Sequence, residues 1–265
     1  MRLQKRLEHR LNRLLFQRRS DPIIVLGNHK SGTSAVASLL ADCGQLTKSI
    51  DIPELWPRSE GLMHGTLDFE EIVAEFPKPF SRELIKEPNL TFFYPAVRRV
   101  FPAARYVFVN RDPRSNIRSF LSRCKLPGDL AELDVDAWDI PHSWRWDFDP
   151  VAWRSEHTHY IDLMAERWNR SADVYLEQPD EMLLLRYEDF LADKRGSIEK
   201  LAAACGLRDC RDISDKLDVQ YQPRGTSRAP RDFFGPENLL RIERLCGSRM
   251  REFDYELESP ELQQG

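Results

Sequence analysis

The sequence predicts a single α/β domain in which a central parallel sheet lies between two layers of helices. Short apolar runs typical of buried strands alternate with helical stretches, and this alternation is typical of a parallel sheet covered on both faces. The chain has 265 residues, of which 41% are hydrophobic, which is enough for one core of ordinary size. The predicted strands are 22–27, 83–86, 105–110 and 182–186.

The first of these strands leads into a glycine-bounded loop that is suited to hold an anion. Residues 22–34 read Pro-Ile-Ile-Val-Leu-Gly-Asn-His-Lys-Ser-Gly-Thr-Ser, and good helix formers follow. Backbone N–H groups at the start of such a helix point into the loop. Gly27 and Gly32 have Walker A spacing, but Thr33 stands where the Walker lysine belongs, and the lysine is Lys30. The loop therefore predicts a phosphate site without the full ATPase pattern.

A second strand and helix carry further basic and polar residues. Arg105 to Asn110 is typical of a buried strand, and Arg111 follows at its carboxyl end. Asp112 is suited to cap the next helix, and Pro113 suits its first position. Because carboxyl ends of parallel strands share one edge, we expect Arg111 to lie close to the phosphate loop.

Four motifs in this chain resemble those of sulfotransferases, the enzymes that use 3′-phosphoadenosine 5′-phosphosulfate (PAPS). Gly-x-x-Lys-Ser-Gly-Thr-Ser is similar to their 5′-phosphosulfate loop, and Arg111 and Ser119 match the arginine and serine that grip the 3′-phosphate. The segment after Met182–Arg186 is similar to their Arg-Tyr-Glu-Asp element, whose tyrosine lies near the adenine. Residues 221–225 resemble a late segment in which a basic residue and a glycine close over the 3′-phosphate. The motifs occur in the family's order over residues 22 to 255.

The resemblance implies a P-loop NTPase-like three-layer fold, with PAPS as co-substrate, its bisphosphate PAP as product, and no required metal. A departure is Ala35, at the position where the cytosolic animal enzymes carry a tryptophan that stacks on adenine. The cofactor-binding residues that the resemblance implies are Gly27, His29, Lys30, Ser31, Gly32, Thr33, Ser34, Arg111, Ser119, Tyr187, Arg224 and Gly225.

Two lysines are expected to assist the transfer. A sulfuryl group carries less negative charge than a phosphoryl group, so lysines can stabilise its transfer without magnesium. Lys30 would neutralise the 5′-phosphate and the bridging oxygen, and Lys86 resembles the family's second lysine, beside the sulfuryl group. None of the predicted strands ends in the aspartate that a Mg·ATP site requires.

The general base is the least defined of the predicted residues. Family members use histidine or glutamate, and the histidine that follows the second lysine in the cytosolic animal enzymes is Pro88 here. Gly61-Leu-Met-His64 resembles the Gly-aromatic-x-Glu segment of bacterial relatives, so His64 is the expected base. Strand alternation would point Glu87 away from the site. The alternatives in the same stretch of sequence are Glu54, Asp51 and Glu60.

Two segments lie outside these motifs. Residues 1–20 predict a basic amphipathic helix, which either docks on the domain through its leucines, lies on a membrane surface, binds a partner, or serves as a targeting peptide. Residues 126–156 carry four tryptophans among Asp134, Asp136, Asp139, Asp147 and Asp149. They form either an acceptor-binding lid or a loop with a small core of its own.

Composition limits the remaining classes of function. A net charge of −4 gives no basic field for nucleic acid, and the five scattered cysteines lack zinc-site spacing. No apolar run reaches the roughly 18 residues needed to span a bilayer. We expect a cytoplasmic protein, with peripheral membrane contact through residues 1–19 as the alternative. The predicted domain covers 21–256, and 257–265 form a C-terminal tail.

Together these features predict in-line sulfuryl transfer from PAPS to an acceptor hydroxyl. The expected acceptors are carbohydrates, lipid-linked compounds or secondary metabolites. Two alternatives remain at this point: a P-loop kinase that uses Mg·ATP, and a non-catalytic scaffold that keeps the nucleotide or a partner but has lost turnover.

Overall fold

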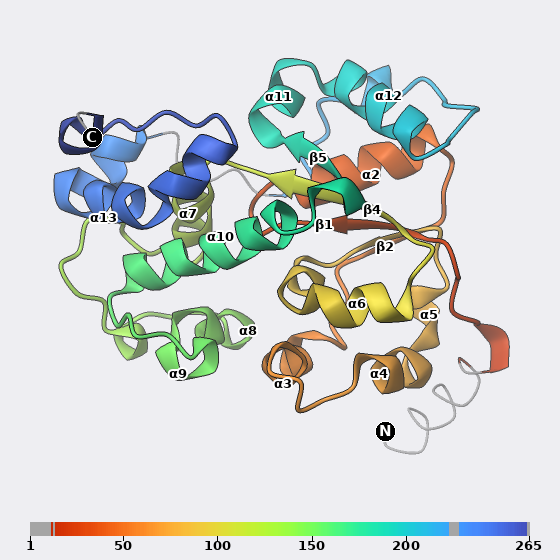
Figure 1. Ribbon diagram of the computed structural model, residues 1–265, viewed down its shortest axis with the longest axis horizontal. Helices are drawn as coiled ribbons and strands as arrows, with labels where there is room; N and C mark the ends of the chain where they lie inside the picture. The colour runs from red at the N-terminus through yellow and green to blue at the C-terminus, as the bar shows by residue number, and fades with distance from the viewer. Residues whose placement is uncertain (1–11, 13, 223–227, 264–265) are drawn as a thin grey trace.

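The computed structural model describes residues 12, 14–222 and 228–263. Its centre is a five-stranded sheet in which all neighbouring strands are parallel, in the order β2-β3-β1-β4-β5 (Figure 1). The predicted α/β class and the four predicted strands are confirmed. The strands are β1 (Ile23–Leu26), β2 (Lys48–Ile50), β3 (Leu84–Lys86), β4 (Arg105–Asn110) and β5 (Met182–Arg186).

The edge strand β2 was missed by the sequence analysis. It has only three residues, Lys-Ser-Ile, and none of them is fully buried. An edge strand of this kind has no apolar run, because it pairs on one side only and its side chains remain partly in solvent. Its pairing with β3 therefore comes from the sheet and not from local sequence.

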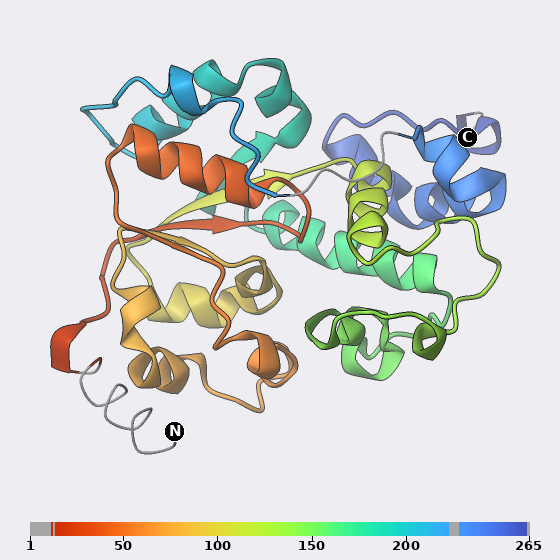
Figure 2. The same cartoon turned by 180° about the vertical axis from the view of Figure 1, so that it is seen from behind.

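Side chains of the central strands alternate between two apolar cores. On one face, Ile24 and Phe108 pack with α4 (Phe69–Glu75), α5 (Pro77–Phe80) and α6 (Tyr94–Val100). On the other, Val25 and Val107 pack with α2 (Thr33–Cys43) and α12 (Lys194–Ala204). Figure 2 shows the sheet from behind, with these helices above and below it. Burial on both faces explains why the strands are almost wholly apolar.

Three helices form a further core beside the sheet. They are α7 (Pro113–Arg123), α10 (Tyr160–Leu176) and α13 (Pro230–Glu252). The predicted stripe of Tyr160, Leu163, Met164 and Trp168 on α10 is buried in this core. Helix α13 is kinked at Gly235, which has a φ of 67° and is followed by Pro236. The remaining short elements are η1 (Trp56–Arg58), α3 (Ser59–Met63), η2 (Pro88–Phe93), η3 (Val135–Ala137), α8 (His142–Arg145), η4 (Trp146–Phe148), α9 (Pro150–Trp153), η5 (Pro179–Glu181), α11 (Tyr187–Ala192), η6 (Ser214–Lys216) and α14 (Pro260–Gln263).

The predicted N-terminal helix lies mostly outside the described residues, which begin at residue 12 and omit residue 13. Its described part ends at Leu15, and residues 16–19 are not helical, so the predicted end at residue 20 is too late. Leu14 and Leu15 are 82% and 71% exposed, so these two leucines do not dock on the domain. Among the described helices, none combines the length and the apolar character needed to cross a membrane.

The N-terminus of α7 is fixed by a buried ion cluster. Asp112 caps the helix by accepting hydrogen bonds from the backbone N–H groups of Arg114 and Ser115, and it also pairs with the Arg114 guanidinium. Nη1 of Arg114 lies 2.8 Å from Oε1 of Glu243 on α13. Glu243 also accepts hydrogen bonds from backbone N–H groups of Glu258 and Ser259. This cluster ties α7, which follows Arg111, to the C-terminal part of the chain.

Replacing Arg114 should destabilise the fold strongly, because Glu243 would remain as a buried carboxylate without its cation. We expect Arg114→Met to lower the free energy of unfolding by about 3–5 kcal/mol in urea titrations. Arg195→Met is the matched control, since both side chains of its pair with Glu199 are more than half exposed and the loss should be far smaller than in Arg114→Met. Equal losses in the two variants would contradict this account of the cluster.

Candidate active site

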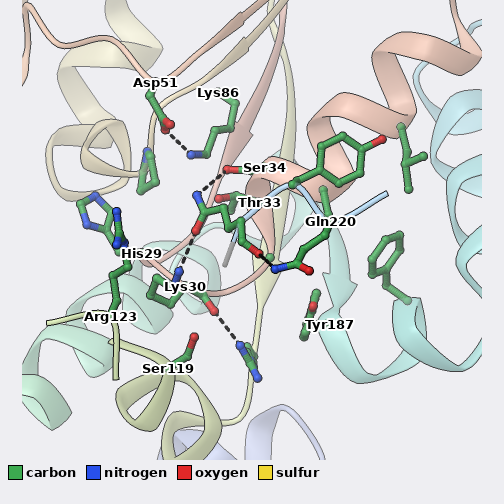
Figure 3. A pocket seen from close by; sticks show the side chains of 18 of the residues that line it. His29, Lys30, Thr33, Ser34, Asp51, Lys86, Ser119, Arg123, Tyr187 and Gln220 are labelled. Atoms are coloured by element: carbon green, nitrogen blue, oxygen red, sulfur yellow. Dashed lines mark hydrogen bonds and ion pairs between the residues drawn. The ribbon is translucent and has the colours of Figure 1, made fainter. Parts of the chain in front are cut away.

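The candidate site lies at the carboxyl edge of the sheet, around the end of β1. Strand β1 pairs with β3 on one side and β4 on the other, so successive connections leave the sheet in opposite directions there. Such a switch point is where ligands bind in open parallel sheets. A cavity of about 700 Å³ opens at this point (Figure 3). It is lined by the ends of the strands, by α7 and α11, and by the segments 141–144 and 217–222.

The loop between β1 and α2 is tightly held by neighbouring backbone and rings. A Cβ added to Gly27 (φ 133°) would lie 2.3 Å from the Val109 carbonyl oxygen, and one added to Gly32 (φ 92°) would lie 2.2 Å from the Tyr187 ring. Only glycine fits at both positions. Gly32 caps α2 without a side-chain hydrogen bond, which leaves N–H groups of the first turn available to an anion.

Asn116 on α7 holds this loop in place through hydrogen bonds. Its Nδ2 donates to the His29 carbonyl oxygen at 2.8 Å and to Oγ of Ser31 at 3.0 Å. Its Oδ1 accepts from Nδ2 of Asn28 at 3.2 Å. Asn116 is buried and does not line the cavity, so it acts on the conformation of the loop. The sequence analysis did not identify it, although it lies on the predicted helix three residues before Ser119.

Lys30 and Arg111 lie on the same side of the cavity. Nη1 of Arg111 donates to the Lys30 carbonyl oxygen at 2.9 Å, and the guanidinium lies 4.8 Å from the centroid of the Tyr187 ring. The buried Nε of Arg111 has no hydrogen-bond partner, so one donor of this cation remains unsatisfied. A hydrogen-bond acceptor next to this Nε, such as a phosphate oxygen, would satisfy the donor.

The Lys30 ammonium lies in the cavity and forms a hydrogen bond with Gln222. Its Nζ donates to Oε1 of Gln222 at 2.7 Å, and Nε2 of Gln222 donates to Oγ of Ser34 at 3.2 Å (Figure 3). Burial, followed by the positive charges of Arg123, Arg111 and Lys86, lowers the pKa of Lys30 to about 8. An anion that binds there would relieve this repulsion among the cations.

Lys86 and Asp51 form an ion pair at the opposite wall of the cavity. Lys86 is the last residue of β3 and is buried, whereas Asp51 follows β2 and is partly exposed. The backbone N–H of Asp51 also donates to the Lys86 carbonyl oxygen at 2.9 Å, which continues the pairing of the two strands. The expectation about strand ends concerned the predicted apolar strands only; the polar edge strand β2, which was not predicted, is followed by an aspartate.

Glu87 lines the cavity, contrary to the prediction that it points away. Strand β3 ends at Lys86, so strand alternation does not extend to Glu87. Its carboxylate accepts hydrogen bonds from the backbone N–H groups of Ile52 and Asn89 and from Nε1 of Trp56. Burial raises its pKa above the usual range. These bonds fix Glu87 in place and leave Asp51 as the acid with a freer side chain.

The segment 126–156 contributes both to the cavity wall and to a small core. Pro141 and Trp144 line the cavity, and the Trp144 ring lies 6.0 Å from that of His29 and 4.9 Å from that of Phe120. Trp146 and Trp153 stack on each other at 5.0 Å, away from the cavity. Burial, then the charges of Arg167, Lys86 and Lys30, places the pKa of His29 well below its usual range, which keeps the imidazole neutral.

The structure brings most of the predicted site residues to this one cavity. Gly27 and Ser31 lie behind its wall, and Arg224 and Gly225 fall outside the described residues. Those that line it are His29, Lys30, Gly32, Thr33, Ser34, Asp51, Lys86, Arg111, Ser119 and Tyr187. Among the described residues, no group of three or more His, Cys, Asp or Glu side chains is arranged to hold a metal ion.

The expected base His64 is not among the lining residues. Nε2 of His64 lies 2.8 Å from the Ala152 carbonyl oxygen and donates to it, which holds the ring against the segment before α10. Glu54 and Glu60 also lie outside the cavity. Of the four residues weighed as bases, only Asp51 lines it. The ring lies there because α3 turns it toward a partner 88 residues away.

Gln222 and Arg123 are among the lining residues that were not predicted from the sequence. Gln222 falls in the late segment that the sequence analysis quoted, but the amide was not assigned a role. Arg123 lies four residues after Ser119, which places both on one face of α7. Helical spacing from Ser119 was therefore a signal that could have revealed Arg123.

The comparisons with known proteins consistently give sulfotransferases. The sequence model of the sulfotransferase family matches residues 66–212, which is more than half of the chain. The matched range includes Lys86, Arg111, Ser119 and Tyr187, but not the phosphate loop.

One curated relative and one solved structure illustrate the similarity. The chain is 24% identical over 229 residues to a protein-tyrosine sulfotransferase of Drosophila melanogaster, covering 74% of this chain and 46% of that protein. The chain thus spans about half the length of this relative. The fold is similar to that of sulfotransferase STF9 from Mycobacterium avium, with a TM-score of 0.55 and 14% identity over 97% of this chain and 82% of that one.

Replacing Asn116 should loosen the phosphate loop. We expect Asn116→Ala to reduce stability by roughly 1–3 kcal/mol, because its partners lose buried hydrogen bonds, and to speed hydrogen exchange of the amides of residues 28–32. Asn238→Ala is the matched control: Asn238 is also buried and donates to the Gly128 and Leu130 carbonyl oxygens, far from the loop. Unchanged exchange in the loop of Asn116→Ala would contradict its assigned role.

Proposed function

The chain belongs to the sulfotransferase family, and on this basis we propose that it transfers a sulfuryl group from PAPS to the hydroxyl of an acceptor. The observation that carries the proposal is the meeting of Lys30, Lys86, Arg111, Ser119 and Tyr187 in one cavity. These residues come from separate parts of the chain, from the loop before α2 to the first residue of α11, and they match the family's motifs in order. A carbohydrate, a lipid-linked compound or a secondary metabolite is the proposed kind of acceptor.

The lining residues fit a nucleotide with phosphates at both ends. The loop from Gly27 to Ser34 offers N–H groups, hydroxyls and Lys30 to the 5′ end, and Arg111 and Ser119 would hold the 3′-phosphate. The unsatisfied Nε of Arg111 supports this assignment, as does the close packing of Gly32 under Tyr187. Apolar side chains near Tyr187, including Phe190 and Leu191, would contact the adenine in place of the tryptophan replaced by Ala35.

The protein's part in the transfer would be to position the two substrates and to stabilise the negative charge that develops between them. PAPS supplies the sulfuryl group. Lys30 and Lys86 hold positive charge on two walls of the cavity, where negative charge would develop during transfer. Lys86 is buried and its ammonium is oriented by Asp51, so little reorganisation of this side chain is needed.

We propose Asp51 as the general base. Its carboxylate lines the cavity beside Lys86, within the region where the acceptor hydroxyl would approach. A carboxylate in this place can accept the hydroxyl proton as the new bond to sulfur forms. The presence of Asp51 in the cavity also weakens the non-catalytic alternative, which would require every weighed base to point away.

One observation favours the kinase alternative and another argues against it. Asp51 at a strand end is the type of residue that binds Mg²⁺ in ATP sites, but here it pairs with Lys86. The position of the Walker lysine is Thr33, the first residue of α2. The two functions differ in the nucleotide that they require.

Nucleotide preference tests the proposal. We expect PAP to raise the melting temperature by several degrees, because a ligand at 100 times its Kd stabilises the folded state by about 2.7 kcal/mol, and ATP with magnesium to have little effect. Lys30→Ala should remove most of the PAP shift. Lys200→Ala, a control on the exposed face of α12, should retain it. A larger shift with Mg·ATP than with PAP would favour the kinase.

Two substitutions test the assignment of the base. With labelled PAPS and an acceptor found by screening hydroxyl compounds, Asp51→Asn should lower kcat by roughly 10²- to 10⁴-fold while PAP still binds. His64→Ala should keep near-normal kcat, because its ring bonds to Ala152 outside the cavity. The reverse result, with turnover lost in His64→Ala and kept in Asp51→Asn, would return the role to His64.

A further inference from the structure

The segment that follows α12 lies along helix α2, and residues 206–222 of it are here called the strap. At the C-terminal end of α2, the backbone N–H of Arg211 donates to the Cys43 carbonyl oxygen at 2.8 Å. At the other end of α2, Nε2 of Gln222 donates to Oγ of Ser34. Figure 2 shows the strap in blue, passing beside α2 towards the phosphate loop. The strap therefore joins the far end of α2 to the candidate site.

Two cysteines lie side by side where the strap meets the end of α2. Cys210 precedes Arg211, so the backbone bond from Arg211 to Cys43 places the two cysteines next to each other, as in a parallel ladder. Burial, followed by a hydrogen bond between the two thiols and the charges of Cys210 and Glu199, raises the pKa of Cys43 to about 12. A disulfide requires Cα atoms roughly 4–7 Å apart and side chains that point towards each other. Bonded backbones and thiols in contact are compatible with that geometry.

The two thiols differ in their access to solvent. Cys43 is 1% exposed, because it belongs to the core between α2 and α12. All five cysteines lie within the described residues, and Cys210 is the exposed one among them. A reagent from solvent therefore reaches Cys210 first, and Cys43 is the thiol that lies behind it.

We propose that Cys43 and Cys210 form a reversible redox site whose oxidant is a low-molecular-weight disulfide, for example glutathione disulfide. The Cys210 thiolate attacks one sulfur of glutathione disulfide, and one glutathione thiolate leaves. Cys43 loses its proton and attacks the Cys210 sulfur of this mixed disulfide, and the second glutathione thiolate leaves. One protein disulfide forms, one glutathione disulfide is reduced, and the two protons of the protein thiols pass to the two glutathione molecules.

The new bond would fix the strap to α2. In the thiol form, the strap is held there by the Arg211 backbone bond and by partly exposed ion pairs such as that of Lys216 with Asp42 at 3.1 Å, which contribute little. Gln222, which bonds to Lys30, lies at the other end of the strap. Oxidation would therefore restrain the segment that borders the phosphate loop. This inference does not require PAPS to be the substrate, so the two proposals can fail separately.

Peptide mapping tests the site directly. The full chain is incubated with glutathione disulfide, alkylated with N-ethylmaleimide and digested with trypsin. Cleavage after lysine and arginine separates the three relevant cysteines, with Cys43 in peptide 31–48, Cys205 in 201–208 and Cys210 in 209–211. We expect most of peptide 31–48 to be joined to 209–211, and dithiothreitol to release both.

Substitutions identify the thiols responsible. Cys43→Ala and Cys210→Ser should each abolish the cross-link, and because Cys210 is exposed, Cys210→Ser keeps the test valid even if Cys43→Ala does not fold. Cys205→Ala is the matched control, since Cys205 is also buried at the end of a helix and should not take part. Oxidation should slow hydrogen exchange of the amides of residues 211–222 at least tenfold in the unmodified protein and not in Cys210→Ser.

Three results of the mapping would overturn the proposal. The first is glutathione that stays attached to peptide 209–211 while Cys43 is alkylated, and the second is a link between peptides 31–48 and 201–208. The third is a full set of free thiols after incubation with glutathione disulfide alone. Unchanged exchange of residues 211–222 in the cross-linked protein would reject the effect on the strap. Failure of PAP to bind would reject the sulfotransferase proposal and leave this one untouched.

Discussion

The site depends on the close approach of the phosphate loop to the ends of β4 and β5. Gly27 lies against the Val109 carbonyl, and Gly32 lies under the Tyr187 ring, with no room for a Cβ at either point. The parallel pairing of β1 with β4 fixes this approach, because it aligns Leu26 with Phe108. As a consequence Arg111, which follows β4, reaches the Lys30 carbonyl oxygen. The sheet register and the two glycines together produce a compact cationic cavity.

Around this loop, each supporting contact comes from a different part of the chain. Asn116 binds the loop backbone from α7, Lys86 faces it from β3, and Gln222 reaches it from the segment before α13. The cluster around Arg114 anchors α7 through contacts with α13 and the residues after it. The positions of Ser119 and Arg123 thus depend on residues more than 100 positions away in the sequence. The third helical core is a structural requirement of the site as well as of the fold.

The sequence predicted the elements that carry strong local patterns. Buried strands are continuous apolar runs, and Asp112-Pro113 is a local helix start, so both could be predicted from the sequence. Strand β2 was not, because its three residues are polar and depend on β3 for pairing, and with it the placement of Asp51 was lost. His64 was expected in the site, but its ring bonds to a carbonyl that only tertiary packing brings near. The described motif residues that line the cavity could be named from the sequence, whereas the direction of the His64 side chain could not.

The bridge formed by Gln222 has a consequence for ligand exchange. Its amide accepts from the Lys30 ammonium and donates to the Ser34 hydroxyl, so it uses the groups that an incoming anion needs. The amide occupies one of the three donors of the ammonium, so an anion that takes all of them competes with Gln222, and the amide can return as the ligand leaves. A neutral molecule gains little from that replacement, since it exchanges one uncharged acceptor for another. The side chain therefore favours occupants with a full negative charge and shields the ammonium in their absence.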